Sequence, residues 1–177
     1  MNTMLNRTLM RVALVWVLAL TPSLGGATDW DLVREQVPFS ERANVAVALV
    51  RSDEGDSFRV YVDDDGNVRG MLSLRVGFNK FSEPVCPTYQ IDERPPLVVG
   101  LSDELCSLEI NKAHFWFGKQ KGRKILSTPL HRLMNGKAVV FRFRLDSIGY
   151  RQSTFSLRRS KFAVEGAIGS GVKIEKE

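Results

Sequence analysis

The sequence has few of the side chains that most often carry out catalysis. Its 177 residues contain only two histidines, His114 and His131, and two cysteines, Cys86 and Cys106. Neither histidine stands at a recognised metal-binding spacing such as H-E-x-x-H. The G-x-S-x-G elbow of serine hydrolases, the P-loop and the G-x-G-x-x-G fingerprint are all missing. The sequence therefore predicts no cofactor, no metal and no catalytic residue, and a hydrolase-like enzyme using either histidine is an alternative.

Long apolar runs are also missing, apart from one near the N-terminus. Residues 12–20 are all apolar, a run too short to span a bilayer. Two arginines precede the run, and Gly25 and Ala27 supply the small-x-small pattern that signal peptidase cleaves. We predict that residues 1–27 are a cleaved signal peptide and that the protein is periplasmic or secreted. An uncleaved anchor is the alternative.

The rest of the chain lacks a large net charge of either sign. Without residues 1–27, which hold two arginines and no acid, 23 basic and 20 acidic residues remain, a net charge of +3. So mild an excess does not indicate a nucleic-acid partner. The 44% apolar and 25% charged content is that of a globular chain. Residues 28–168 are predicted as a single β-rich domain without a transmembrane segment, and residues 169–177 as a polar C-terminal tail.

The two cysteines are predicted to form one disulfide bond. An even count of cysteines in an oxidising compartment favours a Cys86–Cys106 bridge. A redox-active pair is an alternative that lacks the C-x-x-C spacing, and a thiol metal site lacks enough nearby partners.

Short alternating or apolar segments predict a mainly β fold. The expected strands are residues 45–50, 57–62, 71–78, 88–91, 97–101, 106–110, 114–117, 124–127, 137–145 and 150–157. Turn residues between them favour three antiparallel hairpins, which pair 57–62 with 71–78, 114–117 with 124–127, and 137–145 with 150–157. We expect six to nine of these strands to pack as an antiparallel β-sandwich or a partly open barrel.

One or two short helices are expected in addition. Pro129 favours a helical turn over residues 129–134. Ser160 is a candidate N-cap for a helix near the C-terminus, over residues 162–168, which Gly166 interrupts. Residues 28–42 fit either a short helix over 31–36 or an irregular leader.

The turn after residue 62 is a candidate calcium loop. Asp63, Asp65 and Asn67 have the oxygen-donor spacing with which such a loop begins. Gly66, however, falls two places too early for an EF-hand, and Leu74 occupies the position of the closing glutamate. A solvated hairpin tip explains the same residues.

Arginines near the C-terminus are the better functional lead. Period-two alternation places Arg142 and Arg144 on the strand face opposite the phenylalanines, and Arg158 opposite the apolar residues before it. Strict alternation puts Arg151 on the core side, although the adjacent turn allows it to twist outward. The predicted binding residues for an anionic partner are Arg142, Arg144, Arg151, Arg158 and Arg159. A solvated sheet face balanced by neighbouring acids is the alternative.

The chain resembles the invasion-associated locus B family of bacterial exported proteins. The resemblance is carried by the predicted signal peptide, the β-rich body, Cys106 and the segments 139–145 and 154–168. The resemblance implies a small periplasmic β-sandwich-like domain without an established catalytic centre. It carries over no functional residue.

The sequence thus favours an exported, non-catalytic binding protein or envelope accessory protein that contacts an anionic envelope component or another envelope protein. A structural subunit of a cell-envelope complex is a further alternative. Such a subunit would present an exposed apolar patch or an edge strand in place of a charged face.

Overall fold

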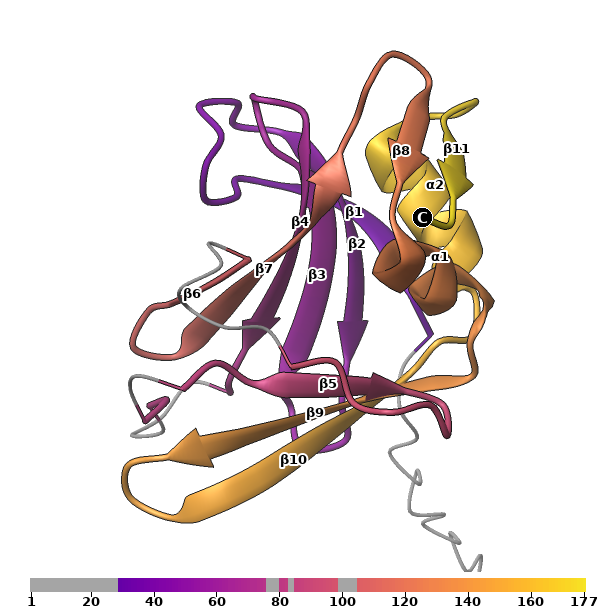
Figure 1. The fold of residues 1–177 in the computed structure, drawn as a ribbon. Helices are drawn as coiled ribbons and strands as arrows, with labels where there is room; N and C mark the ends of the chain where they lie inside the picture. The colour runs from indigo at the N-terminus through magenta and orange to yellow at the C-terminus, as the bar shows by residue number, and fades with distance from the viewer. Residues whose placement is uncertain (1–28, 76–79, 83–84, 99–104) are drawn as a thin grey trace, which may run out of the picture.

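The computed structural model describes residues 29–75, 80–82, 85–98 and 105–177. Within these ranges the chain forms two antiparallel sheets, one small parallel pair of strands and two helices. The larger sheet curls into a half-barrel, and the second sheet lies across its lower end in the view of Figure 1. The predicted mainly β fold is confirmed. The eleven strands exceed the expected six to nine.

The curled sheet has six strands in the order β1-β2-β3-β4-β7-β6. Their bounds are Asp31–Glu35 (β1), Val45–Arg51 (β2), Ser57–Val62 (β3), Asn67–Ser73 (β4), Lys112–Lys119 (β7) and Cys106–Leu108 (β6). The predicted hairpin of the third and fourth strands is confirmed, and Gly66 supplies the positive φ of its turn. β4 begins earlier than residue 71, and the expected residues 76–78 lie outside the described ranges.

The second sheet has the order β10-β9-β5, with bounds Gly149–Ser156, Ala138–Leu145 and Thr88–Ile91. The predicted β9–β10 hairpin is confirmed, and β5 is the edge strand expected at residues 88–91. Phenylalanines at alternate positions of β9 are buried, as period-two spacing requires. Phe141 of β9 packs 4.8 Å from Phe58 of β3, ring centroid to ring centroid, so the two sheets share one core.

Two helices lie beside the open side of the curled sheet (Figure 1). Helix α1 (Thr128–Asn135) begins as predicted, with Pro129 in its first turn and the Ser127 hydroxyl accepting a hydrogen bond from the Leu130 amide. Helix α2 (Ser160–Ile168) packs against β2 and β3.

Two expectations about α2 are wrong. The N-cap is Arg159, because the Ser160 hydroxyl instead donates a hydrogen bond to the carbonyl of Leu133 in α1. The helix also continues through Gly166. A Cβ there would lie 2.7 Å from Leu32 Cδ2, so the glycine lets β1 approach the helix closely.

Two strand assignments also need correction. Residues 31–35 form β1, neither a helix nor an irregular leader, because they pair along their whole length with the buried strand β2. β8 (Lys124–Leu126) does not form the expected hairpin with β7, apart from an isolated bridge in the intervening turn. It pairs in parallel with β11 (Lys173–Glu175), a strand inside the polar C-terminal segment. Gly118, at φ 136°, lies beside a register shift between β7 and β4, near the end of β7.

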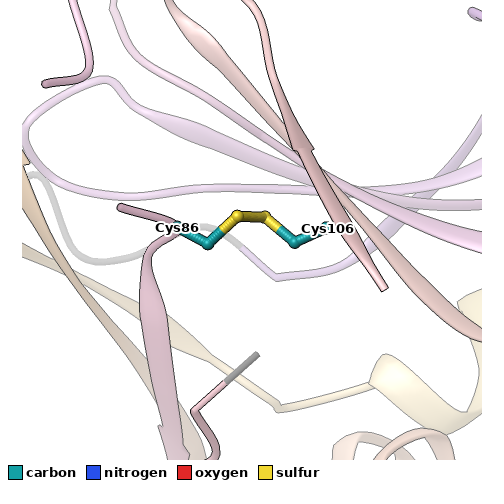
Figure 2. The surroundings of a disulfide bond; sticks show 2 residues. All are labelled: Cys86 and Cys106. Carbon is teal, nitrogen blue, oxygen red and sulfur yellow. A yellow bond between two sulfur atoms is a disulfide. The ribbon is translucent and has the colours of Figure 1, made fainter. Parts of the chain in front are cut away.

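The predicted disulfide bond is present. It joins Cys86, just before β5, to Cys106 at the start of β6, with the two Cα atoms 6.5 Å apart (Figure 2). Both cysteines are buried in the common core. Because β5 and β6 belong to different sheets, the bond ties the second sheet covalently to the edge of the curled sheet.

Replacing both cysteines with serine is expected to lower the free energy of unfolding by about 3 kcal/mol, because the bond closes a loop with a sequence separation of 20 residues. Urea titration of the oxidised protein and of the double variant measures the difference. Chemically reduced wild-type protein should unfold like the variant. Equal midpoints for oxidised and reduced wild type would contradict the prediction.

Candidate functional site

The outward side of the second sheet is the only place where two of the five candidate arginines share a face of a strand, among the residues described. Arg142 and Arg144 are exposed on β9, as the alternation predicts. Residues directly opposite each other in paired strands lie on the same face. The register therefore defines an outer polar face of Thr88, Gln90, Val140, Arg142, Arg144, Tyr150, Gln152 and Thr154. None of these positions is acidic.

The other three candidate arginines lie elsewhere. Arg151 stands opposite Phe143 in the register, so it belongs to the core-facing side of β10 and is half-buried. Strict alternation, without any outward twist, therefore describes its position. Arg158 donates two hydrogen bonds of 2.8 Å to the Asp29 carboxylate, and this contact lowers the pKa of Asp29. Arg159 caps α2 in the left-handed region, at φ 66°.

The β9–β10 hairpin tip carries exposed apolar side chains at the end of the outer polar face, to which Tyr150 belongs. Ile148 is 62% exposed and Tyr150 is 84% exposed. The Lys80 ammonium lies 2.9 Å from the Asp146 carboxylate and lowers its pKa. Arg144 lowers the same pKa to a smaller extent. The Asp146 carboxylate, which interacts electrostatically with Arg144, is thus already paired with a lysine. The tip combines an aromatic ring, an aliphatic side chain and uncompensated positive charge.

The two histidines lie on different elements, His114 on β7 and His131 on α1. His114 is 2% exposed, and its Nε2 is 2.9 Å from the Glu109 carboxylate. Its Nδ1 has no hydrogen-bond partner among the described residues. Burial lowers the pKa of His114, and Glu109 partly opposes this shift. Within the described ranges, no hydroxyl or thiol group is hydrogen-bonded to the His114 imidazole ring.

The aspartates of the β3–β4 turn act as structural anchors. Asp63 accepts hydrogen bonds from the amides of Asp65 and Asn67, from the Asn67 side chain and, at 2.9 Å, from Arg69. Asp64 accepts hydrogen bonds from the Ser40 hydroxyl, from the backbone amide of Glu41 and from the side chain of Arg42. Both carboxylate oxygens of Asp63 are therefore occupied by protein donors, and Asn67 Oδ1 accepts from Trp116 Nε1. In the described part of the chain, no three His, Cys, Asp or Glu side chains gather to hold a metal ion.

The contacts that Asp64 makes hold residues 36–44, here called the strap, against the outward side of the curled sheet. Beneath the strap lies a small apolar cluster that includes Val37, Tyr61 and Met71. Phe39 of the strap meets the His114 ring edge-on at 5.4 Å, and the Arg69 guanidinium lies 4.9 Å from its ring centroid. The strap thus explains why His114 is buried on a sheet face that alternation alone would expose.

A groove of about 450 Å³ lies between β7 and β8. Trp116, 37% exposed, and the exposed Leu126 line it together with Lys119, Lys121 and Lys124. Lys124 is paired with Glu175 at 2.6 Å. This groove lies on a different element pair from the outer polar face, so the basic turn after β7 does not extend the face formed by β9 and β10.

Comparison with known proteins finds no matching protein family, no matching curated protein and no matching solved structure. The resemblance to the invasion-associated locus B family therefore stays an expectation from the sequence. Across the described residues, no helix is long and apolar enough to cross a membrane.

His114 is expected to make folding stability depend on pH. Its pKa in the folded protein lies below the ordinary value of 6.5, so the unfolded chain binds more protons in the interval between the two values. The stabilisation is complete above that interval and is lost as the pH falls through it. The free energy of unfolding, from urea titrations between about pH 8 and pH 5.5, should decrease toward acid.

The variant His114→Gln should flatten this slope, and His131→Gln, which replaces the other histidine on α1, is the matched comparison. A slope that survives in His114→Gln would show that another group carries the pH dependence.

Proposed function

We propose that the protein is an exported, non-catalytic binding protein of the cell envelope, and that its outer polar face docks on an anionic lipid surface. One observation carries the proposal. The outer polar face has two arginines and no acidic side chain over three paired strands. A sheet face that was merely solvated would be expected to balance those arginines with cross-strand carboxylates.

The electrostatics of the face favour a partner with closely spaced negative groups. Arg142 has neutral neighbours on both sides, Thr88 on β5 and Gln152 on β10. Guanidinium groups bind phosphate oxygens in a bidentate manner and are weakly hydrated, which makes them suitable for a surface of phosphate head groups. Each arginine near an anionic membrane contributes about 1 kcal/mol.

The hairpin tip favours lipid over an acidic protein. Tyr150 and Ile148 are exposed beside Arg144, and amphipathic or apolar side chains of this kind insert at the boundary between head groups and acyl chains. Apart from Val140, the remaining positions of the face are hydroxyl and amide side chains, which hydrogen-bond to head groups without adding charge.

Export is supported by the N-terminal sequence and by the disulfide bond. Residues 1–27 have the charged start, the apolar run and the cleavage pattern of a signal peptide. The Cys86–Cys106 bond is of the kind that persists in oxidising compartments.

The mature protein is expected to begin at Thr28. Expression of the full chain in a bacterium, followed by osmotic-shock fractionation and intact-mass measurement, checks both the cleavage and the location. A protein that stays in the cytoplasm with residues 1–27 attached would contradict export, and one that stays in the membrane uncleaved would favour the anchor.

Reversing the charge of both arginines, Arg142→Glu with Arg144→Glu, is expected to weaken binding to vesicles by roughly 30-fold or more. The vesicles contain phosphatidylglycerol and phosphatidylcholine, and co-sedimentation gives the bound fraction. Arg94→Glu with Arg123→Glu is the matched control, because it makes the same charge change at exposed sites off this face. Its effect should be much smaller.

Salt and lipid composition provide further checks. Binding should decrease as the salt concentration rises and should be absent on vesicles of phosphatidylcholine alone. Equal binding by the two double variants would overturn the assignment of the face. No binding to anionic vesicles by wild type would overturn the lipid partner.

A further inference from the structure

A separate groove lies on the outward side of the curled sheet, beside the strap. It has a volume of about 500 Å³, within the range of small-molecule sites. Its lining comes from the end of β1, the start of β3, the end of β4 and the start of β7. The side chains that matter for its chemistry are Glu35, Ser57, Arg59, Ser73, Arg75 and Lys112. We call it the Arg59 groove.

Arg59 is held in place on the groove floor. Its side chain is 19% exposed, and its Nε donates to Glu35 at 2.7 Å. Its Nη1 donates to the hydroxyl groups of Ser57, at 2.6 Å, and Ser73, at 3.3 Å. The second terminal nitrogen, Nη2, has no acceptor among the described residues. An ordered, half-buried guanidinium group therefore keeps free donors for a ligand.

The two serines are also left as donors. Each hydroxyl oxygen accepts from Arg59, and neither O–H has an acceptor within the described part of the chain. Because arginine accepts no hydrogen bond, these protons are directed to another partner. The floor of the groove thus presents hydrogen-bond donors, whereas Glu35, the only carboxylate among its described lining residues, already accepts from Arg59.

Two further cations stand around the floor. The amide of Arg75 donates to Asp56 at 2.8 Å, and Asp56 is buried and accepts from Ser153 of β10. This chain of contacts positions the backbone of Arg75 from the second sheet. The Lys112 ammonium group lies 3.3 Å from the Glu109 carboxylate. Lys112 lines the groove, whereas Glu109 does not. Among the described lining residues, three cations, Arg59, Arg75 and Lys112, stand against one carboxylate, Glu35.

From this geometry we infer that the Arg59 groove binds a small phosphorylated ligand of the sugar-phosphate class. The donors of Arg59 and of the two serine hydroxyls, in a lining with more cations than carboxylates, suit phosphate oxygens. A volume of about 500 Å³ exceeds the size of a phosphate ion alone, and the amide groups of Gln36 and Asn111 in the lining suit sugar hydroxyls. The inference does not rest on the outer polar face, which lies on the other sheet.

Isothermal titration of the oxidised protein with glucose 6-phosphate, inorganic phosphate and glucose tests the site. We expect glucose 6-phosphate to bind more tightly than inorganic phosphate, and glucose not to bind measurably. Arg75→Gln should weaken binding roughly tenfold, because it removes charge-assisted hydrogen bonds. Ser57→Ala with Ser73→Ala should also weaken it.

Glu35→Gln should change affinity in the opposite direction. Removing the carboxylate leaves Arg59 held by the two serines and raises the local positive potential, so affinity should rise about fivefold. Arg142→Gln is the control on the outer polar face and should leave the titration unchanged. Thermal midpoints show that each variant is folded.

Absence of heat with both phosphates would overturn the site, as would wild-type affinity in Arg75→Gln and in the serine variant together. Equal affinity for phosphate and glucose 6-phosphate would overturn the sugar component. These results are independent of vesicle binding, so failure of the lipid proposal and failure of this one are distinguishable.

Discussion

The aromatic contact between the two sheets is the interaction on which the rest of the structure depends. Phe58 of β3 is fully buried and packs against Phe141 and Phe155 of the second sheet, and against Phe117 of its own sheet. A Cβ on Gly70 would lie 2.4 Å from the Phe117 ring, so this glycine makes room for the cluster. Because this packing buries the inner faces of both sheets, their outward faces remain available for binding.

The buried polar contacts link those outward faces to the core. Asp56 is 1% exposed and is satisfied by a hydroxyl group from β10 and by the amide of Arg75. Burial of a carboxylate is tolerated only where donors compensate for lost hydration, and here the donors come from both layers. The same contact that joins the sheets thus positions a groove residue, while the Asp64 anchor holds the strap that borders the groove.

The outer polar face and the Arg59 groove use arginine in different ways. On the face, Arg142 is exposed among neutral side chains, which suits a broad, screened attraction to a charged surface. In the groove, Arg59 is held by three protein acceptors, which suits recognition of one phosphate group at short range. The difference follows from burial, since an ordered guanidinium loses less side-chain entropy on binding than a mobile one.

The sequence by itself determined the features that depend on local periodicity and on pairs of scarce residues. Alternation predicted the β9–β10 hairpin and the outward direction of Arg142 and Arg144, and the two cysteines predicted the disulfide bond. Pro129 is a local signal for α1 in the same way, whereas its capping residue Ser127 lies in a segment predicted as a strand. Alternation even predicted the inward side for Arg151, where an outward twist had been allowed.

Only the tertiary structure decided which distant segments meet. β1 is a strand because β2 offers it a pairing edge, and β8 pairs with β11 across nearly fifty residues. Arg158 is neutralised by Asp29, and Arg59 shares a groove with Arg75 and Lys112, although no spacing in the chain relates them. Hydrogen-bonding edges and charges do not specify their partners locally. The partner is set by the shared aromatic core, which brings the segments together.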